Sequence, residues 1–257
     1  MDNVIMNANP VFVGLSNYIT DLTHPVFWEA CKNTLIFTVC SVAFHLILGL
    51  TFAMLINTEM INRTIRVVFR VIFILPWVFT AAIVAILWRL MMAPSGIINF
   101  FISVFMFSGE PIPIEWMGSS KTALFAVIFV NIWAGYPFYM ISLLAGLQGI
   151  PGDLYEAALV DGANAVQRFF SITIPQLTPI IISMGMLDFI WASQQFSMVW
   201  MTTGGGPVHA TEMIGTFTYK QAFQTYTFSM ASTSAVIILI ISLCLAAVYV
   251  YNQKVRD

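Results

Sequence analysis

The sequence predicts an all-α fold in which a bundle of helices crosses a membrane several times. Of the 257 residues, 59% are hydrophobic and only 9% are charged, whereas about a quarter of the residues in ordinary soluble domains are charged. The hydrophobic residues are also gathered into runs of about twenty, the length that a helix needs to cross the hydrocarbon core of a bilayer. We therefore expect one polytopic membrane domain over residues 1–257, without a separate soluble domain.

Five apolar stretches are long enough to form spans. They cover residues 34–56, 67–90, 123–144, 177–200 and 230–251. Residues 96–107 are also apolar but too short to cross, so they predict an interfacial or re-entrant helix between Pro94 and Gly109. Pro76 and Pro137 lie inside two of the spans and predict kinks there.

Lysine and arginine residues predict the orientation, because loops on the cytoplasmic side of a membrane are enriched in them. If residues 151–176 are cytoplasmic, the basic residues divide into an inner set of Arg63, Arg66, Arg70, Arg168, Lys254 and Arg256 and an outer set of Lys32, Arg89, Lys121 and Lys220. Five spans then place residues 1–30 outside and the C-terminus in the cytoplasm. Residues 1–30 carry no Lys or Arg, so we expect no signal peptide there. Such a start leads us to expect that one further N-terminal span is missing from this chain.

Residue patterns for catalysis or metal binding are missing from the sequence. The three cysteines lie far apart and in or beside apolar runs, and the three histidines share no local spacing. We therefore expect no catalytic residues, no metal and no cofactor. The net charge of −2 gives no reason to expect a nucleic-acid partner. An ion-driven secondary transporter usually shows buried acidic or basic relays, and Asp188 is the one residue that we regard as a candidate for such a relay.

Residues 151–176 form a polar segment between the third and fourth predicted spans. Asp153 and Glu156 form a variant of the capping box, which predicts a helix that starts at Leu154. Gly162 suits the C-terminal cap of that helix. Its predicted central face consists of Leu154, Ala157, Ala158 and Asp161. Small side chains at the centre of this face would let another surface approach closely.

A second short helix is expected through residues 169–170, and Pro175 is expected to end it near the next span. The segment would then lie across the membrane face as a helix-turn-helix, with Glu156 and Asp161 available to a basic partner. The alternative is a solvated connector, although connectors between helices are usually shorter than this one.

The same segment carries a sequence signature. Glu156-Ala157-Ala158, Gly162 and the run Ile172-Thr173-Ile174-Pro175 resemble the EAA signature of permease subunits in binding-protein-dependent ABC importers, with Ile174 in place of the usual Leu. Residues 12–18 resemble the extracytoplasmic stretch of sugar-type permeases. Residues 202–208, with Gly205-Gly206-Pro207, predict a flexible turn and resemble the loop before the last span of those permeases.

The resemblance covers the chain from residue 11 onward and is strongest for the maltose and glycerol-phosphate type of permease subunit. It implies the fold of type I ABC importers, here with five spans and without the usual first span. It also implies that residues 151–176 are a cytoplasmic coupling-helix loop that receives the motion of an ATPase. The coupling residues would be Glu156, Ala157, Ala158, Asp161, Gly162 and Pro175.

The family resemblance also implies the partners and the location. These are a second homologous permease subunit, a dimer of cytoplasmic ATP-binding subunits, an extracytoplasmic solute-binding protein, a sugar substrate and the lipid of a bacterial inner membrane. The chain itself would be no enzyme, and transport would follow alternating access driven by ATP.

The resemblance to the maltose permease extends to a substrate pathway. Asn131, Gly135 and Phe138 match sugar-facing positions, and their spacing of four and three places them on one helix face. Trp191 and Gln195 match further sugar-facing positions four residues apart. The predicted pathway set is Asn131, Gly135, Phe138, Asp188, Trp191 and Gln195.

Each pathway residue also has a structural explanation. Asn131 and Gln195 could join neighbouring helices, and aromatic side chains could simply fill space. Asp188 could pair with a Ser or Thr or bind substrate hydroxyls, and the sequence leaves both open. The third and fourth spans carry no Lys or Arg, which favours a neutral mono- or oligosaccharide over a phosphorylated solute. The alternatives are import of a glycerol-phosphate-like or other small polar solute and, with less support, a stand-alone secondary transporter.

Overall fold

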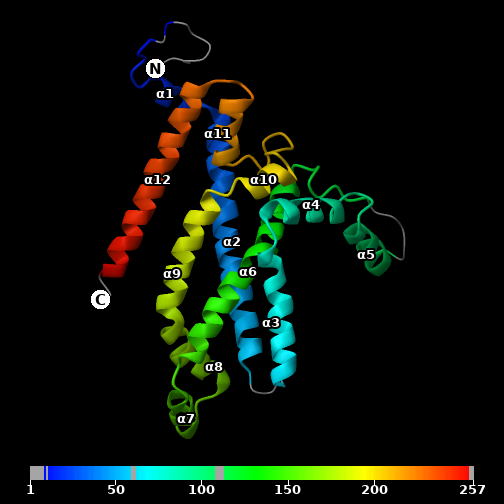
Figure 1. Ribbon diagram of the computed structural model, residues 1–257, viewed down its shortest axis with the longest axis vertical. Coiled ribbons are helices and arrows are strands. Elements are labelled where there is room, and N and C mark those ends of the chain that lie inside the picture. Colours follow the sequence, from blue (N-terminus) through cyan, green and yellow to red (C-terminus); the bar gives the residue numbers. More distant parts are fainter. Residues whose placement is uncertain (1–8, 10, 59–61, 108–112, 255–257) are drawn as a thin grey trace. The chain divides into compact units, whose positions relative to one another are not determined.

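The structure is a computed structural model that describes residues 9, 11–58, 62–107 and 113–254. Within these ranges every regular element is a helix, which confirms the all-α prediction (Figure 1). The helices are α1 Ser16–Thr23, α2 Pro25–Asn57, α3 Arg63–Val78, α4 Ala81–Met91, α5 Ile97–Met106, α6 Ala123–Gln148, α7 Gly152–Val160, α8 Ala165–Arg168, the π-helix η1 Phe169–Thr173, α9 Ile174–Ser193, α10 Ser197–Thr202, α11 Ile214–Phe223 and α12 Phe228–Lys254.

Three helices in the described part of the chain are long and apolar enough to cross a membrane by themselves. They are Pro25–Asn57, Ala123–Gln148 and the continuous run Ala165–Ser193. They correspond to the first, third and fourth predicted spans. The fifth predicted span falls in α12, whose part Phe228–Cys244 is apolar but shorter than the three long helices. The number of five spans therefore stays a prediction.

The second predicted span, residues 67–90, is broken into α3 and α4. Phe79, which follows α3, has an extended backbone, and Pro76 stands in the last turn of that helix. A proline lacks the N–H that would bond four residues back, so it weakens the turn in which it stands. Instead of the kink that we expected at Pro76, the helix ends at Val78 and a new helix starts at Ala81. The two helices count as one span only if the break between them lies within the membrane.

The interfacial segment that we expected at 96–107 forms the short helix α5. Asn99 fastens this helix: its Nδ2 donates to the carbonyls of Pro94 (3.0 Å) and Ile114 (2.9 Å), and its Oδ1 accepts from Trp116 Nε1 (2.8 Å). Gly109, which we expected to bound the segment, lies outside the described residues.

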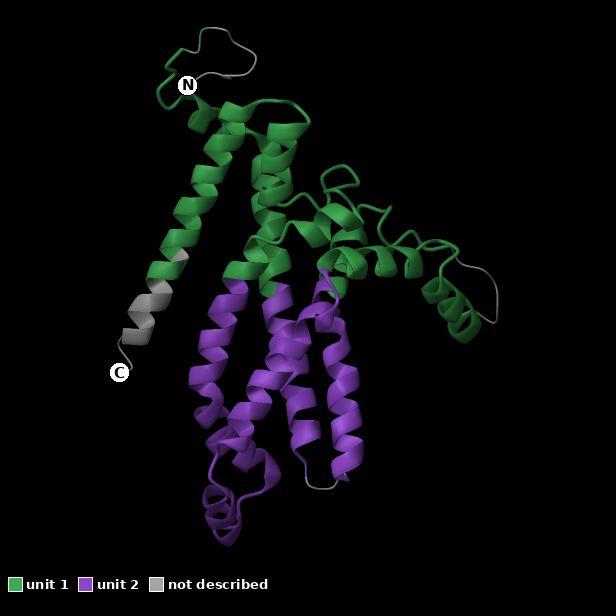
Figure 2. Ribbon diagram, viewed as in Figure 1, with its two compact units in different colours: residues 1–39, 81–130, 190–257 green, residues 40–80, 131–189 purple. Residues whose placement is uncertain are grey.

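The chain divides into two compact units, which Figure 2 colours separately. Unit 1 comprises Met1–Val39, Ala81–Val130 and Ile190–Asp257, and unit 2 comprises Cys40–Thr80 and Asn131–Phe189. The boundaries fall inside α2, α6 and α9 and between α3 and α4. The prediction of one membrane domain for the whole chain stays a prediction.

The core of unit 2 is apolar and is packed closely through glycines. Its buried members are Ala53, Ile56, Tyr139, Met140, Leu143, Leu144, Leu147, Leu177 and Met184. A Cβ on Gly146 of α6 would lie 2.6 Å from Ile180 Cδ1 and 2.8 Å from Leu177 Cδ2 of α9. A Cβ on Gly49 of α2 would lie 3.0 Å from the backbone nitrogen of Met140. Small residues at such contacts are the usual means by which helices approach closely in membranes.

Unit 1 is held by polar contacts as well as by a small apolar cluster of Phe27, Ala30 and Phe217. Asp21 of α1 is fully buried, and its carboxylate accepts hydrogen bonds from Gln221 Nε2 of α11 (2.7 Å) and Ser234 Oγ of α12 (2.6 Å). These bonds tie α1, α11 and α12 together.

Candidate functional site

The polar segment 151–176 contains α7, a well-formed helix that starts earlier than we expected. Its N-cap is Pro151, with an extended backbone and no side-chain capping bond, so the predicted capping box of Asp153 and Glu156 and the start at Leu154 are wrong. Proline readily provides the extended conformation that precedes a helix, and the helix therefore begins at Gly152. Asp153 then lies within the first turn, where its negative charge interacts favourably with the positive end of the helix dipole.

A capping box does occur in the segment, but at the following helix. The Asn164 side chain accepts from the Gln167 backbone N–H (2.9 Å), and the Gln167 side chain accepts from the Asn164 backbone N–H (2.8 Å). The two reciprocal bonds satisfy donors at the start of α8 that the helix itself leaves unpaired.

The C-terminal end of α7 is a Schellman motif, which confirms the cap predicted at Gly162. The Ala163 N–H donates to the Ala158 carbonyl (2.9 Å), and the Gly162 N–H donates to the Leu159 carbonyl (3.0 Å). Gly162 has a φ of +79°, a conformation that glycine adopts without strain.

The surface of α7 is open to solvent. Within this helix, no residue is buried, and Glu156 and Ala157 are exposed. Asp161, which caps the helix, is also exposed, and beside these polar groups Val160 has 89% of its surface exposed. A formed helix that shows both acidic and large apolar side chains to solvent is typical of a surface that another protein covers.

One side chain anchors α7, and the sequence reasoning missed it. Tyr155 is half-buried, as is Ala158, and its hydroxyl is hydrogen-bonded to Thr173 Oγ1 of η1 (2.9 Å). The link joins α7 to the helical run that leads into α9. The signal in the sequence was an aromatic residue with a hydroxyl group in a short helix of otherwise aliphatic and acidic residues.

Pro175 does not end a helix, contrary to our expectation, because α8, η1 and α9 form one continuous run. The residues before it, Phe169–Thr173, form a π-helix in which the Ile174 N–H donates to the Phe169 carbonyl. This wider turn changes the hydrogen-bond register just where the proline, which cannot donate a bond, enters the helix.

Three of the predicted pathway residues surround a buried histidine in unit 2. His45 of α2 is 3% exposed; its Nδ1 lies 2.8 Å from Asp188 Oδ2, and its Nε2 lies 3.0 Å from the Asn131 carbonyl oxygen. The Asn131 side chain donates to Ser41 Oγ (3.0 Å). A Cβ on Gly135 would overlap the His45 ring. We call Ser41, His45, Asn131, Gly135 and Asp188 the His45 cluster.

Both ring nitrogens of His45 have a partner in the His45 cluster. A carbonyl oxygen only accepts, so the contact with Asn131 requires a proton on Nε2. The contact between Nδ1 and the Asp188 carboxyl group pairs two further buried polar groups, which offsets the cost of burying them. A histidine inside an apolar span was the signal that could have identified this cluster.

The other predicted pathway residues are Phe138, Trp191 and Gln195. Phe138 of unit 2 is half-buried and stacks with Trp77, with 6.1 Å between ring centroids. Trp191 and Gln195 belong to unit 1, where Trp191 is 58% exposed and Gln195 is half-buried. Because α9 ends at Ser193, Gln195 stands in the link to α10, and the helical spacing that we expected between Trp191 and Gln195 is wrong.

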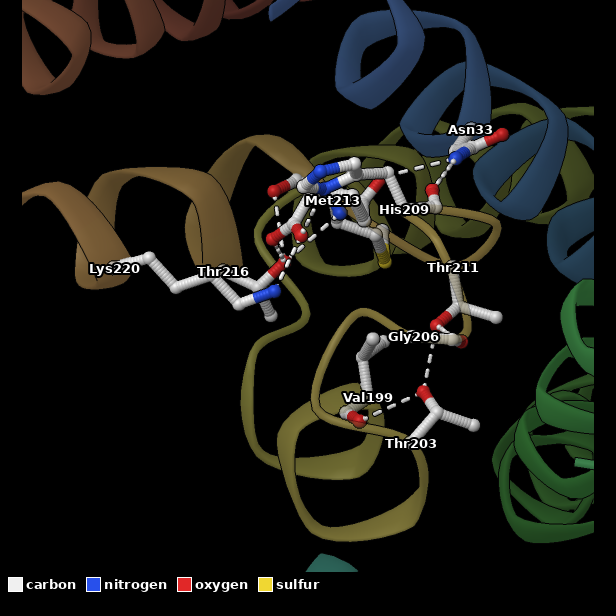
Figure 3. A network of polar contacts seen from close by, with 10 residues as sticks. Asn33, Val199, Thr203, Gly206, His209, Thr211, Met213, Thr216 and Lys220 are labelled. Atoms are coloured by element: carbon white, nitrogen blue, oxygen red, sulfur yellow. Dashed lines mark hydrogen bonds and ion pairs between the residues drawn. The ribbon is translucent and has the colours of Figure 1, made fainter. Parts of the chain in front are cut away.

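Hydrogen bonds hold the Gly-Gly-Pro loop of unit 1 in place, in contrast to the flexible turn that we expected (Figure 3). Glu212 is fully buried and accepts from Lys220 Nζ and from Thr216 Oγ1 (2.7 Å). Asn33 Nδ2 donates to the Glu212 carbonyl (3.1 Å). Gly205 has a φ of +86°, and a Cβ there would lie 2.7 Å from Glu212 Oε2. Only glycine therefore fits against this ion pair.

Comparison with known proteins identifies the family. A family described as "Binding-protein-dependent transport system inner membrane component" matches residues 22–257. The trehalose/maltose transport system permease protein MalF of Thermococcus litoralis is 37% identical, over 95% of this chain and 81% of that protein. The sulfoquinovosyl glycerol transport system permease protein SmoG of Agrobacterium fabrum is 32% identical, over 96% of this chain and 78% of that protein.

Solved structures show the same fold. A chain of a bacterial ABC transporter involved in import of the acidic polysaccharide alginate aligns with a TM-score of 0.83 and 23% identity, over 95% of this chain and 84% of that chain. The MetNI methionine ABC transporter aligns with a TM-score of 0.60 and 16% identity, over 91% of this chain and 98% of that chain. This chain belongs to the family of binding-protein-dependent transport system inner membrane components, the non-catalytic permease subunits of ABC importers.

Proposed function

We propose that this chain is the permease subunit of an ATP-driven importer of a mono- or oligosaccharide and that Glu156–Pro175 couples it to a cytoplasmic ATPase. The observation that carries the coupling role is α7, a capped helix whose acidic and apolar side chains are exposed while Tyr155 ties it to η1. The relatives from Thermococcus litoralis and Agrobacterium fabrum, named as permease proteins of trehalose/maltose and sulfoquinovosyl glycerol transport systems, support a saccharide.

The coupling mechanism follows from how α7 is attached. Glu156 and Asp161 would accept hydrogen bonds from basic groups of the ATPase, and exposed Val160 would add apolar contact. The bond between Tyr155 and Thr173 would pass a displacement of α7 to η1. From there the continuous helical run to Ser193 would carry it into the membrane.

For the substrate pathway we propose two kinds of residue. Phe138, Trp191 and Gln195 would face the sugar, because aromatic rings pack on the CH faces of sugars and amides bond their hydroxyls. Asn131, Gly135 and Asp188 would support the pathway wall through His45. Asn131 and Asp188 are hydrogen-bonded to the His45 ring, and Gly135 leaves the space that the ring occupies.

The proposed assembly contains this chain, a second homologous permease subunit, two ATP-binding subunits and an extracytoplasmic solute-binding protein in a bacterial inner membrane. The N-terminus would lie outside and the C-terminus in the cytoplasm. A chain of a transporter solved with its oligosaccharide-bound periplasmic protein aligns with a TM-score of 0.82, which supports the fold that such an assembly needs.

The experiment that tests the coupling role is Glu156→Ala in the transporter reconstituted with its partners. We expect saccharide uptake and substrate-stimulated ATP hydrolysis to fall about tenfold or more, because a charge-assisted contact to the ATPase is lost. Asp153→Ala, an exposed acidic residue of the same helix outside the signature, is the matched control. Normal stimulated hydrolysis in Glu156→Ala, with the protein present in the membrane, would contradict the proposal.

The same preparation separates the alternative functions. Uptake is measured with neutral saccharides, glycerol 3-phosphate and other small polar solutes, each with its binding protein. If glycerol 3-phosphate is the only solute taken up, the substrate is a phosphorylated solute and not a saccharide. Uptake that persists without ATP and follows an ion gradient would identify a secondary transporter.

A further inference from the structure

A cavity of about 470 Å³ opens in unit 2 beside α7. Its wall is formed by the C-terminal ends of α2 and α6, by Tyr155 of α7, and by the run from α8 into η1. This volume falls within the range of about 300 to 1,000 Å³ that is usual for small-molecule sites. The lining includes none of the α7 side chains proposed to contact the ATPase and none of the proposed pathway residues.

The polar side chains of the cavity have the character of an anion site. Arg168 is the charged member of the lining, and the lining contains no acidic residue. Asn57 and Thr58 add an amide and a hydroxyl group that can donate hydrogen bonds. Tyr155 and Thr173 add two hydroxyl groups bonded to each other, which leaves one of their two protons to donate elsewhere. The positive charge of Arg168 is therefore surrounded by neutral donors and is not cancelled within the lining.

Arg168 also has an unused donor. Its Nε is buried and has no hydrogen-bond partner among the described residues. A buried donor without an acceptor is costly and uncommon in native structures. The guanidinium group presents its N–H donors in a planar fork, which matches the oxygens of a phosphate group.

A second positive charge lies next to the lining. Arg66 of α3 donates from Nη2 to the carbonyl oxygen of Thr58 (2.7 Å), and Thr58 lines the cavity. The remainder of the wall is apolar through Met54, Leu147 and Phe169. The site thus combines a cationic end with an apolar wall, as a phosphate group attached to a larger molecule requires.

We propose that this cavity binds a phosphate-bearing ligand, with the phosphate on Arg168 and the rest of the molecule against the apolar wall. The headgroup of an anionic phospholipid and a soluble phosphorylated metabolite share this chemistry. The ligand would contact both Tyr155 and Thr173, which form the link between α7 and η1. It would stiffen that link and raise the amount of substrate transported per ATP. This regulatory effect rests on the proposed coupling role of α7, whereas the binding itself does not.

The test measures binding on the whole assembled transporter. In one arm, nanodiscs of phosphatidylcholine with or without phosphatidylglycerol are analysed by native mass spectrometry for retained lipid. In the other arm, inorganic phosphate and glucose 6-phosphate are titrated in phosphatidylcholine nanodiscs by calorimetry. We expect Arg168→Gln to weaken binding about tenfold or more in the arm that contains the true ligand, because a charge-assisted bond is lost.

Two further variants make the test specific. Arg63→Gln removes the same charge from an exposed position on α3 that does not line the cavity, and binding should stay within about twofold of the wild type. Asn57→Leu removes an amide donor and fills part of the cavity, so it should weaken binding as Arg168→Gln does. It keeps the proposal testable if Arg168→Gln fails to assemble.

The outcomes are distinct. Retention of phosphatidylglycerol that depends on Arg168 would identify a lipid, and saturable binding of glucose 6-phosphate or phosphate that depends on Arg168 would identify a soluble ligand. Equal binding by the wild type and both cavity variants, or no binding in either arm, would overturn the site. Binding that depends on Arg168 but leaves transport per ATP unchanged would support the site and overturn its regulatory effect. Failure of the proposed import function would instead appear in the uptake measurements, which the binding arms do not use.

Discussion

At the scale of single residues, the ring of His45 explains why a glycine stands at position 135. The ring occupies the space that a Cβ at position 135 would need, while its two nitrogens contact Asp188 and the Asn131 carbonyl. The glycine therefore has a packing role that spacing along α6 does not reveal. The same contacts show Asn131 bonded to Ser41, which is the helix-joining alternative considered for this residue.

Gly135→Ala should destabilise the protein by about 1 to 3 kcal/mol, the usual cost of adding a methyl group to a packed site. Thermal unfolding in detergent measures the effect. Gly185→Ala is the matched control, because nothing lies within 4 Å of a Cβ at position 185 in α9. His45→Ala should restore room for the new methyl group, so the loss caused by Gly135→Ala should be smaller in the His45→Ala background. Equal losses in both backgrounds would contradict the packing role.

At Gly162 the backbone conformation, and not contact with neighbouring side chains, is the reason for a glycine. With a φ of +79° and nothing within 4 Å of a Cβ, Gly162→Ala would be strained but would not clash. The expected cost is about 1 to 2 kcal/mol, concentrated at the end of α7. Hydrogen exchange of the α7 amides should accelerate and uptake should fall. Gly152→Ala, at the other end of the helix and also without neighbours within 4 Å, should leave both unchanged.

At the scale of elements, the link between α7 and η1 decides whether motion of the exposed helix reaches α9. Tyr155→Phe removes only the hydroxyl that bonds Thr173 and keeps the ring. We expect ATP hydrolysis to continue while uptake per ATP falls, because α7 would move without carrying η1 with it. Parallel measurement of both rates in proteoliposomes tests this. Proportional loss of both rates, or no loss of either, would count against the link.

The π-helix at Phe169–Thr173 is the element that local sequence rules misjudge most clearly. A proline after a short helical pattern usually marks the end of a helix. Here the wider turn shifts the hydrogen-bond register, so Pro175 enters a continuous run from Ala165 to Ser193. The helix that sequence reasoning ended at Pro175 therefore continues as far as Ser193.

At the scale of the whole molecule, the proposed orientation can be tested through two exposed valines. Val160 in α7 is 89% exposed and Val208 in the Gly-Gly-Pro loop is 86% exposed. In a background with the three native cysteines replaced by serine, a membrane-impermeant maleimide should label Val208→Cys in intact cells. It should label Val160→Cys only after the membrane is permeabilised. The reverse pattern would invert the topology.

The sequence by itself determined the fold class, the family signature and the glycine that ends α7. Each of these depends on residues that are close along the chain: runs of apolar residues, the spacing from Glu156 to Gly162, and a conformation that glycine alone adopts easily. Such local properties can be recognised without knowing the tertiary fold.

Only the tertiary structure decided which polar groups meet. His45 and Asp188 are 143 residues apart, Asn33 and Glu212 are 179 apart, and Tyr155 reaches Thr173 across a turn. Sequence reasoning selected Asp188 but left its partner open, and it passed over His45, Tyr155 and the cavity around Arg168. Buried polar groups need partners, but the identity of a partner depends on which helix faces pack together, and spacing along the chain does not contain that information.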